Sequence, residues 1–577
     1  MKTFYKLSTV FFLFLLITFL IKSAGWAGNS STYISDEKSA NINVDNSTGK
    51  HTNVAAELIK DRKSSFAFPE FELLRFEDGN DLQAKSFSSD AVILELDKNL
   101  LKSFNELSPR DIKIKIPFGP SNKYMELMLS RIEVFSENYK VNEITRSGNI
   151  YHNYKGGLYY TGIIKDDNNS IASLSVFENS VMAIISTGKG NYVLGSAKNG
   201  NKYIFYNDIN LIEKPKFECK SGDSYNELYR SYKIPSGTPN SSSTTSPVRM
   251  YYVCDYQMYL DNGSNINNVG NFVTGAFVHV KTLYLNENIN VEISAIDVYN
   301  FADPYRSYST SQTFEILKLF GTNTQDNFNG DLAQLLSSRT PVMGGIAWIK
   351  VLCQSYEPSS QSGRYSFCQI ENTYSPYPVF SWTVEVMTHE AGHNFGSMHT
   401  HACVWPVFPF GGIGAIDSCY DAEGNCFTFT VPNNNGTIMS YCHLNGNINF
   451  LNGFGSLPGD TIRLRYNQAV CLDSANFSSE QPVTFGLLQN YPNPFNPGTS
   501  IKFALPEGGY VSIKIYDLMG KEVAAFVNNK YYPIGIFSAY FDASHYNLSS
   551  GVYFYRIDVN RNAINVFSEI KKMVLVK

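Results

Sequence analysis

Three histidines at fixed spacing constrain this chain more than any other feature of its sequence. They lie in the segment H-E-A-G-H-N-F-G-S-M-H. His389 and His393 are four residues apart, so on a helix their imidazoles project from one face and can reach one metal ion. Glu390 is rotated by one residue step, which places its carboxylate beside that ion. Gly396 can adopt a positive φ, which lets the chain leave the helix and return His399 as third ligand.

The residues before the histidines favour a helix. Val384, Met387, Ala391 and Phe395 recur at spacings of three and four, which predicts a buried face distinct from the ligand face. Ser381 is the expected N-cap residue. A helix with two solvent-facing histidines is the alternative for H-E-x-x-H alone, and the added glycine and third histidine argue against it. Three ligands leave a fourth position open for water, as in catalytic zinc sites.

The amino-terminal residues and the net charge of the chain limit the class of protein to which it can belong. Two lysines, an apolar run to Ile21 and small residues up to Ala27 predict a secretory signal peptide over residues 1–27. A single membrane anchor is the alternative. No later stretch approaches spanning length, so no membrane span is expected after signal removal. A net charge of −5 over 577 residues argues against a nucleic-acid partner.

The rest of the chain divides into segments of different pattern, because 577 residues exceed one ordinary core. In the segment that ends at residue 235, alternating apolar residues predict β-rich structure from about residue 66 onward. Ser, Thr and Pro then form a linker at 236–247, where proteolysis is expected. Residues 248–475 predict mixed α/β structure, and 483–577 a small β-sandwich. Within the α/β segment we expect strands at 248–253, 291–299 and 345–353, and a helix at 266–285.

Nine cysteines would enter an oxidising compartment if the chain is exported. Eight lie between Cys254 and Cys471, an even set that could form four bridges, and their connectivity cannot be read from the sequence. Cys219 lies outside this set.

With these residues in place, residues 248–475 resemble the metzincin zinc metallopeptidases, most closely their reprolysin-like (adamalysin-type) branch. Thr437-Ile-Met-Ser-Tyr441 resembles the Met-turn of that family, with Met439 packing beneath the metal. The resemblance implies an α/β catalytic domain with a mixed twisted sheet and an active-site helix. It also implies Zn²⁺ on the three histidines and peptide-bond hydrolysis with Glu390 as general base. Calcium sites are possible, but no EF-hand-type loop is visible.

Some residues near the motif leave alternatives open. Thr400 stands where reprolysins usually have Asp. Tyr441 resembles a tyrosine that helps bind the metal or the oxyanion in astacins and serralysins. The alternative is that Tyr441 has only a packing role. His401 is expected in the outer shell or at the surface. Gly345–Ile349 resembles the edge strand on which metzincins align an extended polypeptide substrate.

Cys219 suggests how the enzyme is kept latent. A thiolate is a strong zinc ligand, so this residue could fill the open position. Similar cysteine switches in reprolysin and matrixin propeptides imply that residues 28–235 are a propeptide and the chain a zymogen. A free cysteine, or one paired within the cluster, is the alternative.

The final segment suggests where the protein goes. Residues 488–497 read L-Q-N-Y-P-N-P-F-N-P, and with 511–521 and 551–556 they resemble the C-terminal sorting domain of bacterial type IX secretion cargo. This resemblance implies an immunoglobulin-like β-sandwich, the type IX machinery as partner, and a protein secreted across the outer membrane or attached to the cell surface. An immunoglobulin-like binding module that stays attached is the alternative.

The sequence therefore predicts a secreted zinc metalloendopeptidase made as a zymogen. A surface adhesion protein that keeps the same fold without activity is the alternative from another class.

Overall fold

A computed structural model gives the fold. It describes residues 53–576 except 64–67, 78–81, 120–122, 198–201, 214–245, 343, 372–376, 408–411, 427–435, 445–446, 474–484, 491–492, 533–534 and 562–563. The predicted signal peptide, Cys219 and nearly all of the predicted linker lie outside these residues.

The N-terminal region, residues 53–213, is β-rich as predicted. Alternating runs such as S-L-S-V and V-M-A-I-I form antiparallel neighbours in a sheet that has ten strands in the described residues. The sheet order is β1 (Glu70–Phe71), β4 (Asp111–Pro117), β5 (Tyr124–Arg131), β8 (Leu158–Ile164), β9 (Asp167–Val176), β10 (Val181–Thr187), β11 (Gly190–Ser196), β12 (Lys202–Asn207), β3 (Val92–Leu96) and β2 (Leu74–Phe76).

Short helices accompany this sheet. The Asp97 carboxylate accepts hydrogen bonds from the backbone N–H groups of Asn99 and Leu100, so it caps one of them, α4. Leu101 and Phe104 on α4 are buried and join the sheet's core. The helices are α2 (Val54–Lys63), α3 (Leu82–Phe87), α4 (Lys98–Leu107) and the 3-10 turn η1 (Asp208–Asn210).

The second sheet belongs to the predicted α/β domain. Its neighbouring strands are mostly parallel, and an antiparallel strand lies at each edge. The predicted strands at 248–253 and 291–299 are confirmed, but the strand expected at 345–353 ends at Ala347. The order is β16 (Gly345–Ala347), β17 (Tyr365–Gln369), β15 (Leu332–Ser337), β13 (Val248–Cys254), β14 (Val291–Tyr299), β6 (Phe135–Thr145) and β7 (Gly148–His152).

Strands β6 and β7 come from the N-terminal region, so the second sheet does not begin at residue 248. Strand β6 runs parallel to β14, with Ile293 opposite Phe135 and Tyr299 opposite Ile144. The N-terminal region therefore contributes two strands to the sheet on which helix α9 packs.

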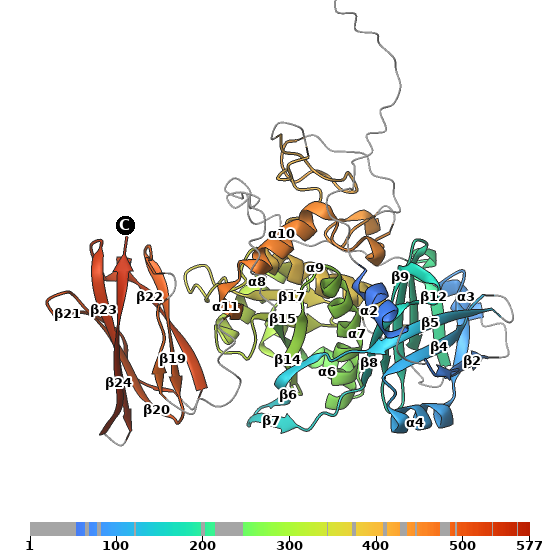
Figure 1. The fold of residues 1–577 in the computed structure, drawn as a ribbon, viewed down its shortest axis with the longest axis horizontal. Coiled ribbons are helices and arrows are strands. Elements are labelled where there is room, and N and C mark those ends of the chain that lie inside the picture. Colours follow the sequence, from blue (N-terminus) through green and yellow to red (C-terminus); the bar gives the residue numbers. More distant parts are fainter. Residues whose placement is uncertain are drawn as a thin grey trace, which may run out of the picture. The chain divides into compact units, whose positions relative to one another are not determined.

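Helices cover both faces of this sheet (Figure 1). Helices α7 and α9 pack on one face with Tyr252 and Cys254, whereas α8 packs on the other with Val253, because side chains alternate along β13. The helix predicted at 266–285 is confirmed as α7. The helices are α6 (Tyr256–Asp261), α7 (Ile266–Asn286), α8 (Thr313–Thr324), α9 (Phe380–Phe395), α10 (Ser456–Asn467) and α11 (Val470–Asp473), with 3-10 turns η2 (Pro304–Ser307), η4 (Cys442–Leu444) and η5 (Phe450–Asn452).

Helix α9 carries the motif and ends where the sequence predicts. Gly396 has φ 111°, and its N–H donates to the carbonyls of Gly392 and His393. Ser381 was expected as N-cap, but it lies inside the helix and no side chain caps α9. All residues of α9 are buried, so the helix is enclosed rather than exposed on one face. The periodicity predicted one buried face, whereas neighbouring segments cover α9 on every side.

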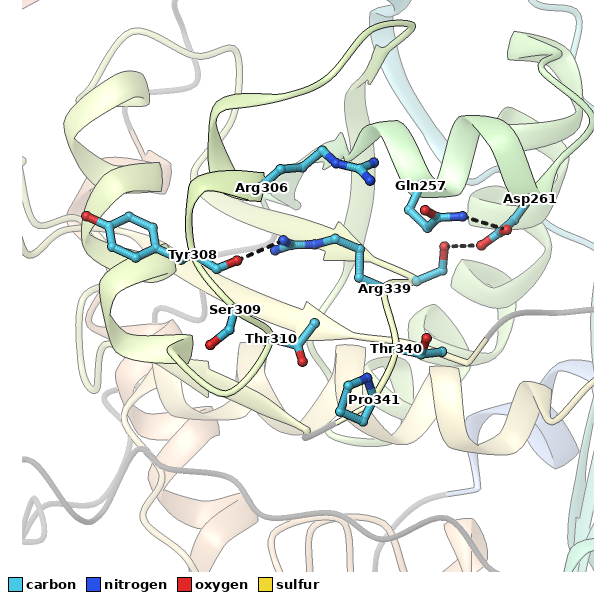
Figure 2. A pocket seen from close by; sticks show the side chains of 10 residues that line it. Gln257, Asp261, Arg306, Tyr308, Ser309, Thr310, Arg339, Thr340 and Pro341 are labelled. Carbon is cyan, nitrogen blue, oxygen red and sulfur yellow. Dashed lines mark hydrogen bonds between the residues drawn. The ribbon is translucent and has the colours of Figure 1, made fainter.

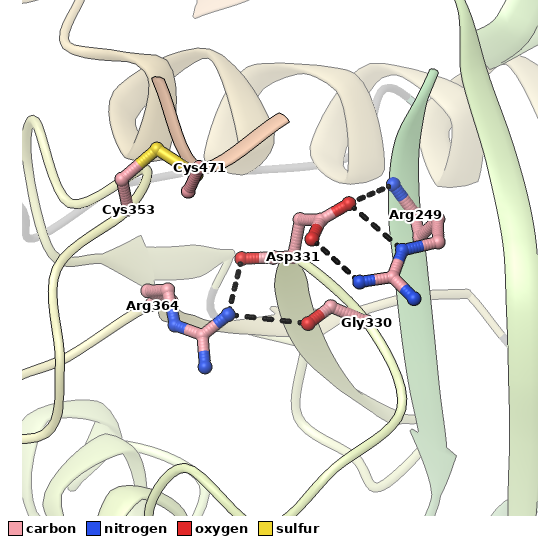
Figure 3. Close-up of a disulfide and its surroundings, with 6 residues drawn as sticks. All are labelled: Arg249, Gly330, Asp331, Cys353, Arg364 and Cys471. Carbon is pink, nitrogen blue, oxygen red and sulfur yellow. Dashed lines mark hydrogen bonds and ion pairs between the residues drawn. A yellow bond between two sulfur atoms is a disulfide. The ribbon is translucent and has the colours of Figure 1, made fainter. Parts of the chain in front are cut away.

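Two arginines secure the ends of the central strands, and the Cys353–Cys471 disulfide lies nearby (Figure 3). The guanidinium of Arg249 donates to both carboxylate oxygens of Asp331, at 3.1 and 2.9 Å. Arg364 donates to the carbonyls of Gly330 and Asp331. These contacts tie β13, β15 and β17 together where β15 begins.

The carboxyl-terminal segment is β-rich, with two sheets that share one core. Val511, Ile513 and Ile515 alternate inward as predicted, and they pack with Ile501 and Phe503 of the other sheet. The strands are β18 (Gly486–Leu487), β19 (Gly498–Leu505) and β22 (Gly535–Asp542) in one sheet, and β21 (Glu522–Tyr532), β20 (Gly509–Tyr516), β23 (Gly551–Arg561) and β24 (Ile564–Leu575) in the other, with the 3-10 turn η6 (Ala543–Tyr546).

The eight cysteines from Cys254 to Cys471 do not form the four disulfides that their number would allow. Three bridges join described cysteines, and Cys254 and Cys368 are free and buried. In the sheet Cys254 is opposite Leu336, which is opposite Cys368. Two strand spacings, about 9–10 Å, therefore separate the Cα atoms of the two cysteines, which is too far for a bridge. The bridges are Cys353–Cys471, Cys403–Cys426 and Cys419–Cys442.

Thiol labelling tests this arrangement. In unfolded, unreduced protein, an alkylating reagent should modify Cys254 and Cys368 but none of the six bridged cysteines. In folded protein both thiols should resist the reagent, because burial raises their pKa well above the usual value. Peptide mass spectrometry reads out both states. A Cys254–Cys368 peptide pair in unreduced protein would contradict the strand order.

Candidate metal centre and substrate edge

The structure brings the three predicted histidines together. The Nε2 atom of His393 lies 3.1 Å from Nε2 of His389 and 3.0 Å from Nε2 of His399. All three side chains are buried. His389 and His393 come from adjacent turns of α9, and the reversal at Gly396 brings in His399. The spacing in the sequence thus becomes a cluster of nitrogen atoms.

An acceptor on the far side of each ring fixes its orientation. The Nδ1 atom of His389 lies 2.7 Å from the carbonyl oxygen of Ile438. That of His393 lies 2.8 Å from the carbonyl oxygen of Ser397. His399 Nδ1 lies 2.7 Å from Oε1 of Glu423. Because these oxygens only accept at these contacts, each Nδ1 carries the proton and each Nε2 offers a lone pair to the cluster.

Three lone pairs at this separation repel one another unless a cation lies between them. Protonating a ring does not relieve this repulsion at neutral pH, because burial lowers the pKa of His389 well below its usual value and that of His393 to about 3. The donor set therefore fits a metal ion that prefers neutral imidazole. A second group of possible ligands, Asp417, Cys419 and Cys442, is closed by the Cys419–Cys442 disulfide.

Glu423 is a site residue that the sequence analysis missed. Besides meeting His399, its Oε1 atom lies 3.2 Å from Nε2 of His401. Burial alone would raise the pKa of Glu423, but the two imidazoles outweigh burial and hold this pKa well below its usual range. The His401 ring is buried and stacks on His399, with centroids 5.0 Å apart. His401 therefore lies in the outer shell of the cluster rather than at the surface.

The loop that carries Glu423 is held beside the histidines. Glu423 N donates to the carbonyl of His401, and Cys403 N donates to the carbonyl of Glu423. The Cys403–Cys426 disulfide closes the same loop three residues further on. In the sequence this glutamate is one acidic residue within a cysteine-bounded loop, and nothing in its spacing points to the histidines.

Glu390 lies against the edge strand β16. A Cβ atom at Gly345 would be 2.3 Å from Oε1 of Glu390, so only glycine leaves room for the carboxylate there. Asn394, one turn further along α9, donates to the carbonyls of Trp348 and Tyr365 at 2.8 and 2.9 Å. These contacts hold β16, the last strand of its sheet in the described residues, against the helix that carries His389 and His393.

Met439 and Tyr441 lie on other sides of the cluster. A Cβ atom at Gly392 would be 2.8 Å from the Met439 sulfur, so Met439 packs on α9 between the two histidine turns. The Tyr441 ring lies 4.8 Å from the ring of His399 and 4.5 Å from that of His401, centroid to centroid. Thr400 donates through its N–H to the carbonyl of Met439. Tyr441 thus packs on the histidines, and its role in catalysis stays a prediction.

A separate pocket of about 460 Å³ lies beyond the end of β15 (Figure 2). Arg306 and Arg339 line it together with Asp261, whose carboxylate accepts from Ser338 at 2.6 Å. Arg339 also lies 3.4 Å from the buried Asp255 carboxylate. Positive and negative groups balance here, and none of the three clustered histidines lines this pocket.

Several solved structures match parts of the chain at low sequence identity and low TM-score. Metalloproteinase-II from Bacteroides fragilis is 13% identical, with a TM-score of 0.28 over 52% of this chain and 85% of its own. Wild-type OgpA from Akkermansia muciniphila is 12% identical, with a TM-score of 0.19 over 59% of this chain and 96% of its own. A chaperone–substrate complex matches at 10% identity and a TM-score of 0.22, over 52% of this chain and 39% of its own. No curated protein matches the chain.

Two family models match separate parts of the chain. Residues 489–574 match the secretion system C-terminal sorting domain, which indicates export by type IX secretion to the cell surface or the exterior. Among the described helices, none is long and apolar enough to cross a membrane. Residues 244–450, which contain the histidine cluster and β16, match metallo-peptidase family M12. The chain therefore carries a metallo-peptidase domain of family M12 followed by a secretion-system C-terminal sorting domain.

Proposed function

We propose that this protein is a zinc-dependent endopeptidase that is exported and made as a zymogen. The observation that carries the proposal is the convergence of three oriented imidazoles at a helix whose Glu390 carboxylate lies against the edge strand β16. His389, His393 and His399 are the proposed metal ligands, and Glu390 is the proposed general base.

Zinc fits this donor set better than a hard cation would. Zinc in catalytic sites takes three protein ligands in tetrahedral geometry with Zn–N distances of about 2.0–2.1 Å, which places ligand nitrogens about 3.3 Å apart. The measured Nε2 separations of 3.0 and 3.1 Å are close to this value. When bound, zinc would supply the Lewis acidity that activates a water and polarises the scissile carbonyl.

Glu390 is the residue that would move the proton in this reaction. It follows His389 directly on α9, and its carboxylate lies against β16 at Gly345. It can take a proton from the attacking water and then deliver it to the leaving amine. Its contact with Gly345 also sets its distance from a substrate that lies along β16.

An extended polypeptide fits the edge formed by β16. The strand pairs with β17 on one side, and it is the last strand of its sheet in the described residues. A peptide bound along this side of the sheet would lie extended beside β16 and be recognised through its backbone. Such a peptide would pass Glu390 at Gly345, which places a peptide bond within reach of the histidine cluster.

Latency is proposed from the sequence. Residues 28–235 would act as a propeptide, and Cys219 would occupy the open metal position until the connection to the enzyme domain is cut. Cys219 lies outside the described residues.

The sorting domain would adopt an immunoglobulin-like sandwich, consistent with its two sheets around one core.

A chelator test separates the enzyme from an inactive adhesion protein. The chain cut at the linker should digest casein, lose this activity with a zinc chelator, and regain it with about one equivalent of zinc. Gel electrophoresis of the casein fragments gives the readout. Cleavage that resists the chelator would exclude the proposed mechanism, and no cleavage by zinc-loaded protein would favour the adhesion protein.

Glu423→Gln should weaken zinc binding by about 10–100-fold, because a neutral amide orients His399 less strongly and makes it a poorer ligand. Competition with a chromogenic chelator measures the affinity directly. Asp421→Asn, an exposed change in the same loop, serves as the control and should leave the affinity unchanged. Equal zinc affinity in both variants would remove Glu423 from the metal site.

Glu390→Gln should bind zinc normally and turn over peptides about 10²–10⁴-fold more slowly, since general-base catalysis contributes that much. Metal content and kcat are measured on the same preparation. Glu315→Gln on α8, an exposed position, is the matched control. If Glu390→Gln retained the wild-type kcat, another group would have to be the base.

A further inference from the structure

The N-terminal region completes the sheet of the metallo-peptidase domain. Strand β6 pairs with β14 through matched residues from Ala295 to Tyr299. Two side-chain hydrogen bonds reinforce this ladder: Asn142 donates to the Asp297 carboxylate at 2.7 Å, and Asn300 donates to Glu143 at 2.7 Å. If β6 left, a row of backbone groups on β14 would lose its partners, which is costly for a buried strand.

The same region shares its hydrophobic core with helices α7 and α9. Tyr154, Phe177, Met182 and Tyr206 belong to one buried cluster with residues of both helices. Buried aromatic side chains remove large apolar areas from water, so this shared core favours association strongly. Separation would expose it on both partners.

Glycines allow the two parts to approach closely. A Cβ atom at Gly195 would lie 2.3 Å from the Phe380 ring of α9. On the other partner, a Cβ atom at Gly270 of α7 would lie 2.9 Å from the Tyr154 ring. Such backbone proximity is typical of a fitted interface rather than a loose contact.

Buried polar bonds cross the same boundary. Asn191 donates to the carbonyl of Ile448 at 2.8 Å and accepts from the N–H of Phe450 at 3.1 Å. Ser173 and His279, both buried, are joined by a hydrogen bond of 2.9 Å. Separation would leave these groups without the partners that their burial requires.

These contacts lie away from the substrate edge. They involve β14, α7, the first turn of α9 and residues 448–450, whereas β16 forms the opposite edge of the same sheet. A substrate on β16 and the N-terminal region on β14 therefore do not compete for the same strand.

We propose that residues 53–213 remain bound after the connection at 214–245 is cut, as a noncovalent subunit of the mature enzyme. The partner of the β14 edge and of the α7–α9 surface is thus the chain's own N-terminal region. Maturation cuts the chain within 214–245 but does not remove residues 53–213. That residues 53–213 stay bound is argued from the interface alone. Only the position of the cut rests on the proposal that the protein is made as a zymogen.

The test follows the two fragments after a defined cut. The full chain, with a tag at its amino terminus and Glu390→Gln to prevent self-digestion, receives a protease recognition sequence within 236–245. After cutting at about micromolar concentration, both fragments should elute together in size exclusion, and the tag should retain the carboxyl-terminal fragment. They should separate only in denaturant. Separate elution without denaturant would overturn the proposal, whether or not the protein is a protease.

Matched glycine variants locate the interface. Gly195→Ala forces a Cβ into Phe380, whereas Gly188→Ala adds one where no atom lies within 4 Å. In the cut protein, Gly195→Ala should release the N-terminal fragment at least tenfold faster than Gly188→Ala. Asn191→Ala, which removes hydrogen bonds without adding bulk, should also speed release if Gly195→Ala fails to fold. Release at the control rate from the folded variants would contradict this interface.

Discussion

The constraint on which the rest of this structure depends is the meeting of three imidazole nitrogens within a buried space. Each ring is fixed from behind by an oxygen, two of them backbone carbonyls and the third the Glu423 carboxylate. Such an arrangement is unfavourable for neutral rings alone, because their lone pairs face one another. The surrounding fold supplies the rigidity that keeps them together, and a cation would relieve the repulsion.

Each neighbouring element contributes to that rigidity in a different way. Helix α9 sets the first two rings one turn apart, and the left-handed residue Gly396 returns the chain for the third. The turn at Ile438 and Met439 supports the cluster from one side. Strand β16 lies on another side, where Gly345 leaves space for Glu390. The combination brings the histidine cluster, the Glu390 carboxylate and the edge strand β16 together around helix α9.

Local patterns in the sequence predicted the parts that local physics controls. The spacing of the histidines, the turn at Gly396 and strands such as 291–299 depend on neighbouring residues, so they could be read directly. Contacts between distant segments could not. Glu423 reaches His399 through a disulfide-bounded loop, and β6 joins β14 across more than one hundred residues. The free thiols of Cys254 and Cys368 likewise follow from the strand order, which composition does not reveal.

X-ray absorption at the zinc edge tests the central claim most directly. Purified without added metal, the full chain should contain about one zinc, bound by at least three nitrogen ligands at about 2.0–2.1 Å. His393→Ala should lose this metal, since its ring is the one that contacts both others. Zinc held mainly by sulfur at about 2.3 Å, or an unchanged zinc content in His393→Ala, would contradict the account.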